Sequence, residues 1–96
     1  DVRDIHELKP EESVYRELAM IKVRADASQR ENVIAIANIF RGNIIDVSNE
    51  SLMIEITGNS GKVDAFIRLL GGYEILELAR TGITGLSRGS DDVRYP

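Results

Sequence analysis

The alternating stretch Leu18-Ala19-Met20-Ile21-Lys22-Val23-Arg24-Ala25 decides the fold of this chain. Its odd-numbered residues are all apolar, whereas Lys22 and Arg24 fall on the even positions. A period of two with one partly polar side is typical of a strand that is buried on one face only. We therefore predict a strand over 18–25 that packs one face on a core and leaves the other face open.

A helix is predicted directly after this strand. Ser28 followed by Glu31 fits a capping box, with Ser28 as the N-cap and Glu31 reaching back to it. Gly42 is predicted to end the helix in the left-handed conformation. Between them, apolar residues recur at the spacing of one buried helical face: Val33, Ile36, Ala37 and Phe40.

The rest of the chain repeats this pattern. Strands over 43–47 and 52–57 flank the short turn 48–51, which predicts a hairpin. A second helix opens at 58–60 and ends at Gly71-Gly72, and a strand over 74–81 follows. Residues 83–86 extend that strand or add a short fifth one. The second helix carries its own apolar stripe at Val63, Phe66, Ile67 and Leu70.

The order β-α-β-β-α-β predicts a ferredoxin-like fold of the α+β class. Right-handed crossovers place both helices on one face of a four-stranded antiparallel sheet. The other face has no cover within the chain, and Leu18, Met20 and Met53 make its middle apolar. We predict that this face meets a partner through the candidate interface residues Met20, Lys22, Arg24, Met53 and Glu55. In the alternative interpretation the charged residues and Thr57 solvate the face, and the methionines are incidental.

Length and composition exclude several classes of protein. With 96 residues, the chain is predicted to hold one domain at 17–89, a linker at 1–16 and a flexible tail at 90–96. The lack of cysteine excludes a disulfide scaffold and a thiolate metal site. No apolar stretch approaches the roughly 20 residues of a membrane span, so no membrane partner is expected. A net charge of -4 and no aromatic residue on the open face argue against nucleic acid.

Catalytic chemistry is not predicted either. His6 is the only histidine, and we expect it to be exposed to solvent. Gly61-Lys62 does not complete a phosphate-binding loop, because Ile56 and Val63 stand where glycine and a hydroxyl residue are required. Glu74 and Glu77 are three residues apart on a strand, so we expect them on opposite faces rather than as an acid–base pair. No nucleophile, base and orienting group can be assembled.

Five segments, in order and at the right spacing, resemble the C-terminal domain of the small, regulatory subunit of acetohydroxyacid synthase (acetolactate synthase). The resemblance covers roughly residues 10–89. It is carried by RELAMIKV at 16–23, ANIFRGNIIDV at 37–47, IEITG at 54–58, KVDAF at 62–66, and RTG at 80–82 with LSRG at 86–89.

The resemblance implies a regulatory domain and not an enzyme. In the family an ACT domain precedes this one and binds the feedback amino acid, typically valine, and residues 1–8 would be at most its last strand. Thiamine diphosphate, Mg²⁺ and FAD belong to the separate catalytic subunit, so no cofactor is expected here. The expected partners are a second copy in a homodimer and the catalytic large subunit, in the cytoplasm. The alternative is a free-standing amino acid sensor that binds its ligand between protomers, through backbone donors at 26–28 and 59–61.

Overall fold

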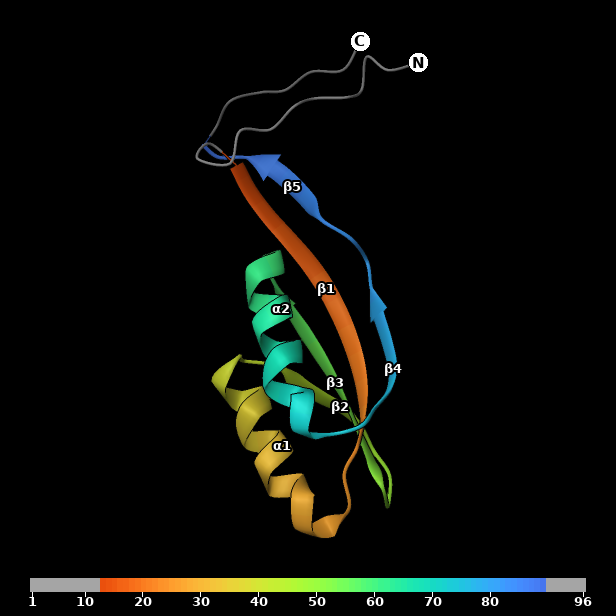
Figure 1. The fold of residues 1–96 in the computed structure, drawn as a ribbon. Coiled ribbons are helices and arrows are strands. Elements are labelled where there is room, and N and C mark those ends of the chain that lie inside the picture. The colour runs from red at the N-terminus through yellow and green to blue at the C-terminus, as the bar shows by residue number, and fades with distance from the viewer. Residues whose placement is uncertain (1–12, 90–96) are drawn as a thin grey trace.

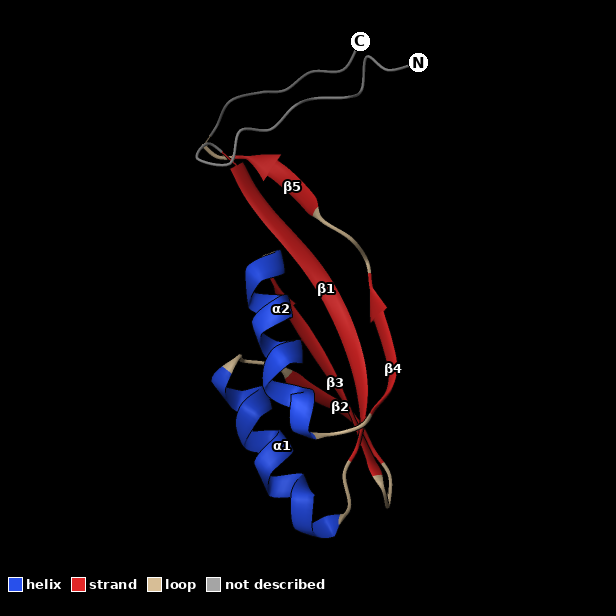
Figure 2. Cartoon of the chain, in the orientation of Figure 1, coloured by secondary structure: helices blue, strands red, loops and turns tan. Residues whose placement is uncertain are grey.

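A computed structural model describes residues 13–89, and in it two helices cover one face of an antiparallel sheet (Figure 1 and Figure 2). The strands of the main sheet lie in the order β2-β3-β1-β4, and β5 pairs with the outer part of β1. The predicted α+β, ferredoxin-like fold is confirmed. Its elements are β1 (Ser13–Arg24), α1 (Ala27–Ile39), β2 (Asn43–Val47), β3 (Ser51–Gly58), α2 (Ser60–Leu69), a 3₁₀ turn (Leu70–Gly72), β4 (Ile75–Arg80) and β5 (Thr84–Ser87).

The core lies between the sheet and the helices, as the alternation of apolar residues in the strands and their spacing in the helices predict. The odd-numbered side of β1 is fully buried from Ala19 to Val23, as is Ala25 just after the strand. Phe40 meets Phe66 edge to face with ring centroids 5.4 Å apart. Aliphatic side chains supply most of the remaining apolar burial, which is the main force that holds such a domain together. The buried core residues are Ala19, Ile21, Val23, Ala25, Val33, Ala37, Leu52, Ile54, Ile56, Val63, Phe66 and Leu70.

The ends of α1 differ from the prediction. Asp26, not Ser28, is the N-cap, and its partner in the capping box is Gln29 rather than Glu31. An aspartate two residues earlier forms the cap because its carboxylate accepts hydrogen bonds from both Ser28 N and Gln29 N. At the other end Arg41, with φ 57°, adopts the left-handed conformation that the sequence predicts for Gly42.

Strand β1 begins five residues earlier than predicted, at Ser13 instead of 18. Residues 13–16 pair with β5, and we call these two segments the ribbon. Part of the predicted linker 1–16 therefore belongs to the sheet, while the domain division itself stays a prediction. Linker residues 1–12 with His6, and the predicted tail 90–96, lie outside the described residues.

Both edge strands of the main sheet are irregular. In β4 the pairing with β1 passes from Glu77 to Ile75, which leaves Leu76 as an extra residue. In β2 the pairing with β3 passes from Ile44 to Asp46, which leaves Ile45 over. Each extra residue is a β-bulge, which bends an edge strand and interrupts its ladder.

Candidate interaction surface

The sheet face opposite the helices is uncovered within residues 13–89, and we call it the open face. All five predicted interface residues lie on it, on the two central strands β1 and β3. Met20 stands opposite Glu55, and Lys22 stands opposite Met53, because the two strands pair antiparallel in that register. The structure thus brings the five residues together as a surface, although their role as an interface stays a prediction.

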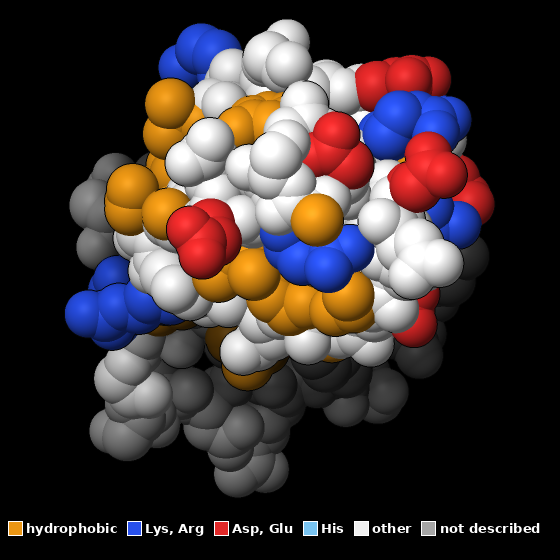
Figure 3. All heavy atoms as spheres, turned by 90° about the horizontal axis from the view of Figure 1, so that it is seen from below, with side chains coloured by type: hydrophobic (Ala, Val, Ile, Leu, Met, Phe, Trp, Pro, Cys, Tyr) orange, Lys and Arg blue, Asp and Glu red, His pale blue; other side chains and the backbone are white. Residues whose placement is uncertain are grey.

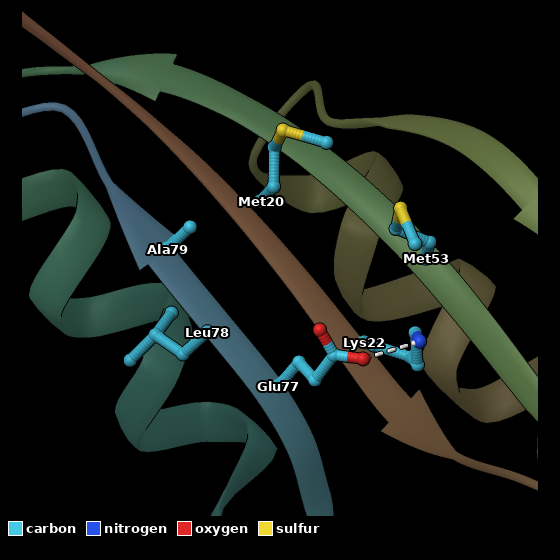
Figure 4. Close-up of a pocket in the computed structure, with 6 residues that line it drawn as sticks. All are labelled: Met20, Lys22, Met53, Glu77, Leu78 and Ala79. Atoms are coloured by element: carbon cyan, nitrogen blue, oxygen red, sulfur yellow. Dashed lines mark hydrogen bonds and ion pairs between the residues drawn. The ribbon is translucent and has the colours of Figure 1, made fainter.

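The middle of the open face is a shallow apolar hollow of about 130 Å³. Figure 4 shows Met20 and Met53 on neighbouring strands, with Ala79 on β4 across from Met20. Met20 is 39% exposed. Flexible, polarisable methionines suit such a surface because they adapt to the shape of whatever packs on them. The lining residues are Met20, Lys22, Met53, Glu77, Leu78 and Ala79.

A row of ion pairs borders the hollow on one side. Lys22 Nζ lies 2.6 Å from Glu77 Oε2, and Arg24 Nε lies 2.9 Å from Glu74 Oε1. The hydrogen bond from Lys22, and then its charge, lower the pKa of Glu77 below its ordinary value. Glu50 adds a longer contact to Arg24 at 3.6 Å. Because these pairs are largely exposed to solvent, they contribute more to the pattern of charge than to stability.

The prediction that Glu74 and Glu77 point to opposite faces is wrong. Both carboxylates reach cations of the same face, Arg24 and Lys22. The reason is the bulge at Leu76, which adds a residue between them and so changes the alternation of side chains. They still form no acid–base pair, because each is paired with a cation of its own.

A second charged cluster was missed in the sequence. Arg80 donates to Glu17 Oε1 through Nε at 3.2 Å and Nη2 at 2.6 Å, and to Asp64 Oδ1 through Nη1 at 2.8 Å. The Glu17 side chain is only 6% exposed, and these carboxylates, Glu17 foremost, raise the pKa of Arg80. The sequence does contain a signal for this cluster. Glu17 lies on the same face of the strand as Ala19 and Ile21, and a carboxylate on a buried strand face requires a partner.

The helix starts proposed for a sensor offer few free donors. Asp26 accepts from Ser28 N and Gln29 N, and Asn59 accepts from Lys62 N. The amino group of Lys62 is bound to Thr57 O at 3.0 Å. Figure 1 also shows that α1 and α2 begin at opposite ends of the helix layer, so their N-termini cannot converge on one ligand within a single copy.

Residues 13–89 contain no cluster of three or more histidine, cysteine, aspartate or glutamate side chains that could hold a metal ion. The helices in this range are also too short or too polar to span a membrane. At the end of the molecule away from the ribbon, Figure 3 shows hydrophobic, basic and acidic side chains intermixed. Fold and surface together define an α+β domain whose distinguishing feature is an uncovered sheet face.

The chain belongs to the family described as the small subunit of acetolactate synthase, whose model matches residues 16–89. It is 52% identical over 91 residues to the probable acetolactate synthase small subunit of Methanothermobacter thermautotrophicus, covering 94% of this chain and 54% of the relative. It is 53% identical over 89 residues to the acetolactate synthase small subunit of Mycobacterium bovis, covering 93% of this chain and 53% of the relative.

A solved structure shows the same fold. The crystal structure of the small subunit of acetolactate synthase from Thermotoga maritima matches with a TM-score of 0.80 and 47% identity, over 88% of this chain and 52% of that chain. The resemblance predicted from the sequence is confirmed. The chain spans about half the length of the relatives it matches.

Proposed function

We propose that this chain is a non-catalytic, regulatory domain of a cytoplasmic acetolactate synthase small subunit. It forms a homodimer through the open face and supports activation or feedback regulation of the catalytic large subunit, in branched-chain amino acid biosynthesis. One observation carries the proposal: a member of this family presents an uncovered sheet face with an apolar hollow at its centre. Thiamine diphosphate, Mg²⁺ and FAD bind to the catalytic subunit, and this domain binds none of them.

The edge strands favour the open face as the site of self-association. Bulges at Ile45 in β2 and at Leu76 in β4 interrupt both free edges of the main sheet. Bulged edges resist pairing with the edge of another sheet, because the row of donors and acceptors is no longer regular. The centre of the open face instead offers an apolar surface, where Met20, Met53 and Ala79 line the hollow beside the Lys22–Glu77 ion pair.

Replacing Met20 with Glu tests the interface. The new carboxylate lies opposite Glu55, and burying both without a cation is unfavourable, so the variant should be monomeric. The matched control is Ile39→Glu, which places the same charge on a residue that is 72% exposed at the end of α1. Light scattering across a concentration series should give a dimer mass for the unchanged chain and for the control. Equal masses for all three proteins would contradict the proposed interface.

A pull-down with the catalytic large subunit tests the second partner. The chain should be retained by that subunit and should form no acetolactate when assayed alone. Retention of Met20→Glu as well would place the catalytic subunit away from the hollow. Loss of retention in both Met20→Glu and Ile39→Glu would point to a partner surface that extends over both faces. No retention of the unchanged chain would contradict this part of the proposal.

Calorimetry with valine, leucine and isoleucine separates the proposal from a free-standing sensor. The helix caps already use three backbone donors of the candidate sensor sites, since Asp26 accepts from Ser28 N and Gln29 N, and Asn59 accepts from Lys62 N. We therefore expect no saturable heat from this chain alone. Saturable binding of any of these amino acids would favour the sensor.

A further inference from the structure

The ribbon is the only route by which the chain enters and leaves the described domain. Residues 13–16 of β1 pair only with β5, whereas β1 pairs with β3 from Glu17 onward and with β4 from Ala19 onward. Figure 1 shows the ribbon projecting past the start of α2, beyond the part of the sheet that the helices cover. Any segment attached before residue 13 or after residue 89 is therefore connected to the core through the ribbon.

The Arg80 cluster sits where the ribbon meets the covered sheet. Arg80 is the last residue of β4, and Glu17 is the first residue of β1 that pairs with β3. The guanidinium holds Glu17 through two of its nitrogens and Asp64, on α2, through the third. One planar cation thus joins three elements, β1, β4 and α2, at the base of the ribbon. A planar guanidinium fixes the relative direction of its partners more closely than an ammonium group does.

Threonine side chains continue this connection into the ribbon. Thr81 N donates to Leu18 O at 2.9 Å, and Leu18 N donates back to Thr81 Oγ1 at 3.1 Å. Thr84 Oγ1 then donates to Arg16 O at 3.2 Å. Between the threonines Gly82 turns the chain with φ 86°, a conformation that glycine adopts without strain. The crossing from β4 to β5 is therefore tied to β1 on both sides of the turn.

We propose that Arg80 is a positioning residue that sets the direction of the ribbon relative to the helix-covered sheet. Through it, movement of α2 at Asp64 is coupled to the orientation of whatever the ribbon carries. Glu17 is the fixed point of this joint, because a carboxylate that is 6% exposed has little freedom to choose another partner. This coupling does not depend on what binds the open face.

Distance measurement between two spin labels tests the joint, and the lack of cysteine makes specific labelling simple. Leu86→Cys places one label on the ribbon, where the side chain is 78% exposed, and Asn32→Cys places the other on the exposed side of α1. Labelled protein is diluted with unlabelled chain so that only distances within one copy are recorded. The parent protein should give a narrow distribution of distances.

Arg80→Gln should broaden that distribution, whereas the matched control Arg68→Gln should not. The control makes the same substitution at an exposed residue in the last turn of α2, which is not one of the predicted interface residues. Arg80→Lys keeps the charge but loses the planar guanidinium, so it should give an intermediate width, and it provides the test if Arg80→Gln does not fold. The proposal is overturned if the folded Arg80 variants keep the parent width, or if Arg68→Gln broadens the distribution equally.

Discussion

Asp26 shows how a single side chain fixes where α1 begins. Its Oδ1 accepts hydrogen bonds from Ser28 N at 2.9 Å, from Ser28 Oγ at 2.7 Å and from Gln29 N at 3.0 Å. Asp26 N in turn donates to Gln29 Oε1 at 3.2 Å, which completes the capping box. The hydrogen bond from the Ser28 side chain, followed by that from the Gln29 backbone, lowers the pKa of Asp26 below its ordinary 3.8.

Asp26→Ala should lower the melting temperature by about 5 °C at neutral pH, because an uncapped helix start leaves backbone donors without a partner. A lowered pKa in the folded state means that the stabilisation is complete above the ordinary pKa of 3.8 and is lost as the pH falls below it. Thermal unfolding from neutral to acidic pH should therefore show the two proteins converging at low pH. Asp46→Ala, at an exposed aspartate of β2, is the control. A pH-independent difference would contradict the role of the ionised carboxylate.

Gly42 is required by close packing and not by its backbone angle. A Cβ at this position would lie 3.0 Å from Ile54 Cγ2 and 3.3 Å from Glu55 O. Gly42→Ala should cost about 1–3 kcal/mol in the free energy of unfolding, which is typical of overpacking. Gly71→Ala, where a Cβ would meet nothing within 4 Å, should change it little. Urea unfolding measures both, and equal effects would show that the contact at Gly42 relaxes without cost.

At the scale of the element, the sequence predicted what depends on local periodicity. Alternation placed β1 and β3, and the spacing of Val63 and Phe66 placed the buried side of α2. The outer half of β1 could not be predicted, because residues 13–16 form a strand only by pairing with β5, some 70 positions away. The bulge at Leu76 could not be predicted for the same reason, because a pattern in one strand does not reveal the register of its partner.

Phe66 is the largest fully buried side chain of helix α2. Its side chain is fully buried and meets Phe40 at an interplanar angle of 64°, which joins the two helices. Phe66→Ala should lower the free energy of unfolding by about 3–5 kcal/mol, because a large cavity remains between α2 and the sheet. Leu69→Ala on the same helix removes a side chain that is 52% exposed and should have a small effect. Urea unfolding that ranks the two variants equally would contradict this view of the core.

At the scale of the whole molecule, the sequence placed all five open-face residues on one surface, since alternation on two paired strands is enough for that. The sequence did not predict that Glu74 and Glu77 lie beside these residues. Glu77 contacts Lys22 and Glu74 contacts Arg24 on the same face only because the bulge changes the alternation between them. The hollow, too, depends on Ala79 of an edge strand whose register no local pattern reveals. What the surface binds is a property of an assembly, and the alternation of one chain carries no information about the second.

If the open face binds a second copy, folding and association are one equilibrium, and the melting temperature must rise with protein concentration. A tenfold increase contributes about 0.7 kcal/mol per chain, which corresponds to roughly 3–5 °C for a domain of this size. Met20→Glu should remove this dependence, whereas Ile39→Glu should keep it, because Ile39 lies at the end of α1 and not on the sheet. Calorimetric melting at several concentrations provides the measurement. A melting temperature of the unchanged chain that is independent of concentration, together with a monomer mass, would contradict the homodimer.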